Sequence, residues 1–181
     1  MRGLVSNYAL SLKLALVLAL LSGGIALTVA GRSRAEGKRP TRPASRVLAI
    51  GSALVIAVAT GLPYDLPYRR EGFGDLVLTP GRGGLSEWRV ILERPDSLAA
   101  VLLVFNVLLY IPLAFFGVLG WKRPAVVLGA CLSLSLLVEA SQYFVTARTA
   151  SLDDVLLNMG GAVVGAMLAG LVRLRGRAAP G

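Results

Sequence analysis

The stretch Leu137–Gly161, LVEASQYFVTARTASLDDVLLNMGG, decides the fold because it joins two apolar runs while carrying acids and amides itself. The apolar residues extend back to Pro124 and forward to Val172. About 20 helical residues cross a hydrocarbon core of about 30 Å, so both runs predict membrane-spanning helices. The polar residues of this stretch therefore lie within, or at the ends of, helices that cross a membrane.

The composition of the whole chain supports this interpretation. Of its 181 residues, 55% are hydrophobic and only 16% are charged, with a mean hydropathy of +0.70. A soluble domain carries about 25% charged residues, and barrel strands would alternate in polarity along each run. We predict an all-α fold, a polytopic transmembrane helix bundle of about five spans. These are Tyr8–Ala30, Val47–Leu62, Leu98–Leu119, Pro124–Val145 and Asp154–Val172.

Lys and Arg residues in the connections predict the orientation, because they resist translocation. The side that holds residues 32–46 carries eleven of them, against seven on the other side. We therefore expect a multi-pass protein of the cell membrane, with its N-terminus outside and its C-terminus in the cytoplasm. Residues 1–62 then form two helices with a basic cytoplasmic loop, residues 63–97 an extracytoplasmic loop, and residues 98–181 a three-helix core with a basic tail.

Two segments of this topology allow alternatives. The first span resembles a secretory signal, but the basic cluster after it favours an uncleaved helix; cleavage would leave four spans. The outer loop of about 35 residues contains several prolines, among them Pro63, Pro67 and Pro80, and is not one regular element. Within it, LSEWRVILE fits either a short interfacial helix with Ser86 as N-cap or an ordered loop.

The residue types present limit the chemistry. The chain has no histidine, which excludes Ser/His and Cys/His nucleophilic systems and most zinc sites, so we expect no metal and no cofactor. Its one cysteine, Cys131, lies in an apolar run and is predicted to be buried. The net charge of +9 comes from residues that flank the spans without interleaved aromatics, so nucleic acid is not an expected partner.

Helical periodicity gathers the polar residues on single faces. Before the last span, Ser151 and Asp154 have the spacing of a capping box. Steps of about 100° per residue place Asp154, Asn158, Gly161 and Gly165 on one face, and small residues spaced in this way let a second helix approach closely. On the fourth span, Ser135, Glu139 and Gln142 share a face. On the third, a stripe of Asn106, Tyr110 and Gly117 surrounds Pro112, which predicts a kink or a broken backbone.

These faces are expected to meet, because Asn106, Glu139 and Asn158 all lie within the outer half of their spans. An ionised Glu139 in contact with lipid would cost several kcal/mol, so it should face the bundle interior. There it either pairs with Arg148 or takes up a proton. Asp153 and Asp154 compete for the same cation, and the sequence does not choose between the acids.

By these same residues the chain resembles the VanZ-like family of membrane proteins, which is named for a protein associated with teicoplanin resistance. The matching pattern covers about a third of the chain, and it departs from the family in Tyr110 and in Ser151, where Phe and an acid are more usual. The resemblance implies a multi-pass protein linked to glycopeptide or cell-envelope phenotypes, but no particular reaction. The residues that match are Asn106, Tyr110, Pro112, Gly117, Glu139, Gln142, Arg148, Asp153, Asp154, Asn158, Gly161 and Gly165.

Three hypotheses follow for the polar residues. In the first they bind a polar headgroup, with Arg148 facing an anionic group and with membrane lipids, an envelope precursor or a lipoglycopeptide as candidate partners. In the second they only hold helices together by hydrogen bonds. In the third, Glu139 or Asp154 is the general base of an enzyme, which is disfavoured because neither histidine nor a nucleophile motif is present.

Overall fold

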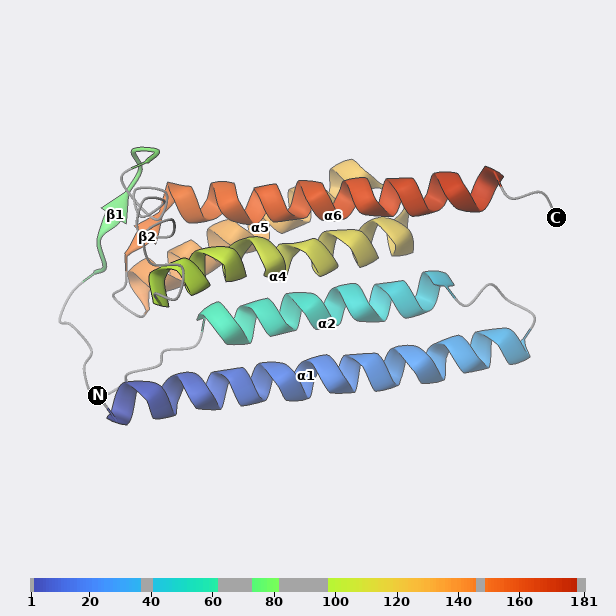
Figure 1. The fold of residues 1–181 in the computed structure, drawn as a ribbon, viewed down its shortest axis with the longest axis horizontal. Helices are drawn as coiled ribbons and strands as arrows, with labels where there is room; N and C mark the ends of the chain where they lie inside the picture. The colour runs from blue at the N-terminus through green and yellow to red at the C-terminus, as the bar shows by residue number, and fades with distance from the viewer. Residues whose placement is uncertain (1, 37–40, 62–72, 82–97, 146–148, 179–181) are drawn as a thin grey trace.

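A computed structural model describes residues 2–36, 41–61, 73–81, 98–145 and 149–178 of the chain. Its helices lie side by side along the long axis, and its two short strands lie at one end of them (Figure 1). In chain order they are α1 (Arg2–Ala35), α2 (Thr41–Gly61), β1 (Leu76–Val77), α4 (Leu98–Trp121), α5 (Pro124–Phe144), β2 (Ala150–Ser151) and α6 (Leu152–Ala178).

Five of these helices are long and apolar enough to cross a membrane, which confirms the predicted helix bundle. The second span begins earlier than the predicted Val47, because α2 starts at Thr41. Large apolar side chains are exposed along all five helices, for example Leu27 at 76% and Met167 at 65%. A bundle surface of this kind suits contact with lipid rather than water.

The helix α4 lies in the middle of the bundle. It packs against α2 on one side and α6 on the other, while α1 covers α2 and α5 packs against both α4 and α6 (Figure 1). The side chains buried between them are mostly small, and the largest that are fully buried include Tyr110 and Ile56. Cys131 is 1% exposed, in agreement with its predicted burial.

Two glycines of α6 set its close approach to α4. A Cβ atom added to Gly161 would meet the carbonyl oxygen of Val107, and one added to Gly165 would meet that of Ile111. These contacts are with backbone, which cannot move aside as a flexible side chain does. Gly117 of α4 has a corresponding role toward α5, because a Cβ there would lie 2.8 Å from Val127 Cγ1.

Helix α4 continues through Pro112 from Leu98 to Trp121, so the broken backbone that was one expectation for this proline is not found. A proline inside a helix removes only one donor to the preceding turn, and the long apolar segment on both sides maintains the helix.

A short parallel strand pair, which the sequence did not predict, joins the segment 73–81, which lies between α2 and α4 in the chain, to the start of α6. Leu76 pairs with Ala150 and Val77 with Ser151. The Ala150 N–H donates to the Asp75 carbonyl at 2.8 Å, and the Gly74 N–H donates to the Tyr143 carbonyl at 2.9 Å. Residues 73–81 are thereby fixed to the end of α5 and the beginning of α6. The segment around Ser86, for which a short interfacial helix and an ordered loop were both predicted as possible, lies outside the described residues.

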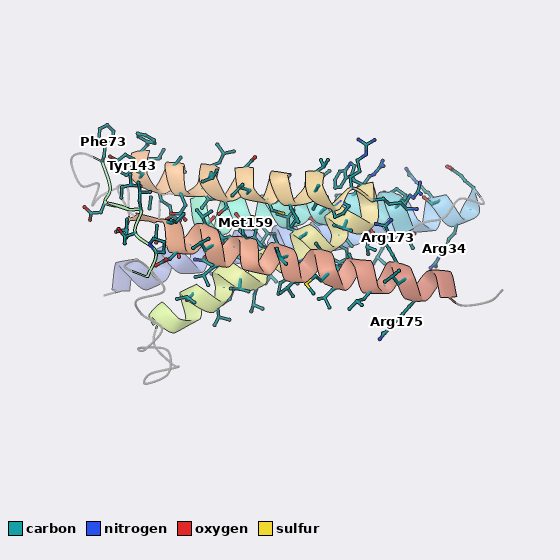
Figure 2. All side chains as sticks on the ribbon, turned by 90° about the horizontal axis from the view of Figure 1, so that it is seen from above. Arg34, Phe73, Tyr143, Met159, Arg173 and Arg175 are labelled. Carbon is teal, nitrogen blue, oxygen red and sulfur yellow. The ribbon has the colours of Figure 1, made fainter. Side chains whose placement is uncertain are left out.

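The two ends of the bundle differ in charge. At one end, here called the basic end, α1 and α6 finish, α2 begins and α4 turns into α5; Figure 2 shows Arg34, Arg173 and Arg175 there. The other end, here called the polar end, carries β1, β2 and the first turn of α6, with Phe73 and Tyr143 beside them (Figure 2). The chain termini lie at opposite ends (Figure 1).

Candidate functional site

The first turn of α6 organises the polar end. Ser151 precedes the helix, and its Oγ accepts a hydrogen bond from the Asp153 N–H at 3.2 Å, as an N-cap does. The reciprocal half of the predicted capping box differs from expectation. The Ser151 N–H donates to Glu139 Oε2 at 2.7 Å, so the carboxylate that reaches it comes from α5 and not from Asp154.

Glu139 is buried, with 7% of its surface exposed, and points into the bundle. Its carboxylate therefore lies at the start of α6, where the backbone N–H groups carry partial positive charge that favours an acid. Gln142, three residues further along α5, is also buried at 9% exposure. Both side chains lie on the face of α5 that was expected to turn away from lipid.

Asp154 is used in a contact between α4 and α6. Asn106 Nδ2 of α4 donates to Asp154 Oδ1 at 3.0 Å. An amide that donates to a carboxylate forms a charge-assisted hydrogen bond when the acid is ionised, and such bonds are stronger than neutral ones. This contact fixes the rotation of the first turn of α6 against the middle helix.

One turn deeper, Asn158 Nδ2 donates to Ser135 Oγ of α5 at 2.9 Å. Ser135 is fully buried and Asn158 is 4% exposed. The second polar atom of this amide, Asn158 Oδ1, is buried without a hydrogen-bond partner in the described structure. The Tyr110 hydroxyl is also buried and has no partner with hydrogen-bond geometry. Ser135 nevertheless lies near enough to this hydroxyl to interact with it, and Glu139 is a further polar neighbour.

Asp153 connects the loop to the site. It is fully buried, and its Oδ1 accepts a hydrogen bond from the Gly81 N–H at 2.9 Å. Residues 73–81 are thus attached at both ends, through β1 and through Gly81. This places the segment beside the first turn of α6.

The structure therefore gathers most of the predicted site residues into one group, here called the polar cluster. It consists of Asn106, Tyr110, Ser135, Glu139, Gln142, Ser151, Asp153, Asp154 and Asn158. Arg148, the predicted cation of the site, lies outside the described residues. Pro112 and Gly117 lie further along α4 and take no part in the hydrogen bonds of the cluster described above. Among the described residues, no three His, Cys, Asp or Glu side chains lie close enough together to hold a metal ion.

Two contacts of the cluster were not predicted from the sequence. Ser135 was on the expected polar face of α5, but no partner was predicted for it, because its match to Asn158 depends on how α5 and α6 are offset along their axes. Gly81 carried no signal beyond its place in a Gly-rich loop, because a backbone N–H has no residue-specific pattern. Its positive φ of 79° is a conformation that glycine adopts readily.

Aromatic rings lie beside the cluster at the polar end. Phe73 stacks on Tyr143 with ring centroids 5.5 Å apart, and it meets Phe144 edge to face at 5.6 Å. Phe73 and Phe144 are 68% and 60% exposed. Exposed aromatic rings at the end of a spanning helix suit the interface between hydrocarbon and water.

Fold and site together define a multi-pass helical membrane protein with a buried polar cluster at one end of a three-helix core. Residues 49–173, more than half of the chain, match the family model described as VanZ/LLP1. The chain belongs to this family, as the resemblance indicated, and the match begins within α2. No curated protein and no solved structure matches the chain.

Proposed function

We propose that this protein binds the polar part of a lipid-linked cell-envelope precursor or of a lipoglycopeptide in its polar cluster. The proposal includes the orientation inferred from the basic residues, in which the polar end faces outward and the C-terminus is cytoplasmic. The ligand then enters from the outer leaflet, where its lipid tail stays in the membrane. Through this binding the protein contributes to teicoplanin and glycopeptide resistance.

The observation that carries the proposal is the pair of buried, unpaired atoms, Tyr110 Oη and Asn158 Oδ1. Each unsatisfied buried polar group costs about 1–3 kcal/mol, so proteins seldom keep one without a partner. The hydroxyl can donate and the amide oxygen can only accept. A sugar hydroxyl or a peptide amide, which both donates and accepts, satisfies the pair together.

The remaining polar groups supply orientation. Glu139 is an acid within a spanning helix, a position that by default marks a functional site. Asn106, Gln142 and Asn158 present amides, and we assign Arg148 to an anionic group of the ligand, such as a phosphate. Exposed aromatic rings at the same end, Phe73 and Phe144, suit contact with the lipid portion.

A structural role is the second candidate, and the bonds of Asn106 to Asp154 and of Asn158 to Ser135 favour it because both join different helices. Hydrogen bonds of this kind contribute roughly 0.6–2 kcal/mol each in membranes. The two candidates differ at Tyr110, whose hydroxyl has no partner with hydrogen-bond geometry in the described structure, although Ser135 lies near it.

Tyr110→Phe is therefore the decisive variant. Removal of the hydroxyl breaks no hydrogen bond of good geometry. We therefore expect wild-type thermal stability together with loss of resistance in a deletion strain challenged with teicoplanin and complemented by the variant. Glu139→Gln and Arg148→Ala should also lose resistance at normal membrane abundance. Tyr143→Phe is the matched control, because it removes the same hydroxyl from a ring outside the cluster.

Normal resistance in Tyr110→Phe, Glu139→Gln and Arg148→Ala would contradict the proposed binding function and favour the structural role. The orientation is tested separately by fusing a reporter that is active only in the cytoplasm to the C-terminus. Activity of that fusion supports an outward-facing cluster, and its absence contradicts it.

A further inference from the structure

A second feature lies toward the basic end, away from the polar cluster. The helices α2, α4 and α5 enclose a groove of about 320 Å³ that is lined only by apolar and small residues. Three of the lining residues, Ile50, Val126 and Trp121, are 55%, 61% and 42% exposed, so the groove opens on the outer surface of the bundle. In a membrane this opening faces lipid. An acyl chain fills such a groove without desolvating any polar group.

The length of the groove fits one lipid leaflet. It extends along α4 from Trp121 to Leu113 and along α5 from Val126 to Leu134. Eight residues of helix rise about 12 Å, and one leaflet of the hydrocarbon core is about 15 Å thick. The groove is therefore long enough to contact an acyl chain over most of the thickness of one leaflet, beginning at the level of the α4–α5 turn.

The groove ends among cations. Arg46 lies over the Trp121 ring, with Cζ 5.7 Å from the ring centroid, and its Nε donates to the Gly120 carbonyl at 3.2 Å. Lys122 and Arg123 follow Trp121 directly and precede α5 at Pro124, and both are exposed. The N-terminus of α5 adds partial positive charge at the same place. Three cations around the mouth of an apolar groove match a lipid with a negatively charged headgroup.

We propose that the groove binds one acyl chain of an anionic phospholipid from the bilayer, with its phosphate against Arg46, Lys122 and Arg123. The acyl chain fills the space between α2 and α5. These two helices pack against each other far less than either does against the rest of the bundle. The bound lipid thereby joins the N-terminal helix pair to the three-helix core. This site is independent of the polar cluster.

Trp121 provides a direct measurement, because it lines the groove and the chain has only one other tryptophan, Trp88. The full chain carrying Trp88→Phe is reconstituted in phosphatidylcholine bilayers that contain increasing amounts of a lipid brominated on its acyl chains, which quenches tryptophan fluorescence on contact. We expect half-maximal quenching at a mole fraction about fivefold lower for brominated phosphatidylglycerol than for brominated phosphatidylcholine. Equal quenching by the two lipids overturns the proposal.

Charge variants separate a defined site from general attraction to the basic end. Arg46→Gln should reduce the preference for phosphatidylglycerol, expressed as the ratio of the two half-maximal mole fractions within each variant. Arg175→Gln removes a charge at the same end from α6, which does not line the groove, and should keep the ratio. An equal fall in both variants shows non-specific attraction and contradicts the site.

Filling variants test the groove itself. Ala130→Leu inserts a larger side chain into the groove and should reduce quenching by both brominated lipids, whereas Ala140→Leu, on an exposed part of α5 outside it, should not. If Ala130→Leu does not fold, Ala53→Leu makes the same test from the wall formed by α2. Unchanged quenching in a folded filling variant overturns the proposal.

Discussion

The contact between α4 and α6 gives the sharpest prediction, because neighbouring glycines of α6 have opposite surroundings. A Cβ at Gly161 would meet the carbonyl of Val107, with the carbonyl carbon 2.9 Å away. A Cβ at Gly160 would have nothing within 4 Å. Gly161→Ala must therefore push α6 away from α4, while Gly160→Ala disturbs nothing.

The paired design isolates the cost of that contact. Both substitutions gain about 1 kcal/mol of helix propensity, which cancels in the comparison. Overpacking of a tight contact typically costs about 1–3 kcal/mol. For a chain of this size the melting temperature of Gly161→Ala should lie roughly 2–12 °C below that of Gly160→Ala.

The measurement uses the single cysteine of the chain. Cys131 is 1% exposed, so a thiol-reactive fluorogenic dye reports unfolding in detergent as this side chain becomes accessible. Melting temperatures of the two variants within about 1 °C of each other would refute the argument that backbone contact at Gly161 sets the helix spacing.

Three further variants probe the polar cluster by the same melting assay. Asn106→Ala removes the donor to Asp154 and should destabilise the protein by roughly 0.6–2 kcal/mol; an unchanged melting temperature would show that this bond contributes nothing. Ser151→Ala removes the cap of α6 and should cost about 1 kcal/mol, and wild-type stability would contradict the capping role. Ser135→Ala loses its bond to Asn158 and should have a lower melting temperature than Ser133→Ala, whose hydroxyl bonds to Gly129 of its own helix. Equal melting temperatures would show that the interhelical bond does not stabilise the protein.

Much of the site was predictable because helical periodicity fixes which side chains share a face. Glu139 and Gln142 on α5 and Asn158 and Gly161 on α6 were expected to turn inward, and all four are buried. The individual partners were not predictable. The choice between Asp154 and Glu139 at the Ser151 N–H depends on the distance between two helices, which no local pattern encodes.

By itself the sequence determined the number of spans, their alternating direction and the inward faces of the core helices. Each of these depends on hydropathy and helical periodicity, which are set by residues close together in the chain. Only the tertiary structure decided the pairing of residues 76–77 with 150–151, the bond from Gly81 to Asp153 and the groove between α2, α4 and α5. These features arise between segments far apart in the chain. They depend on how the helices are rotated and shifted against one another by a few ångströms. Different rotations and shifts are compatible with the same hydrophobic pattern, so the pattern does not predict these contacts.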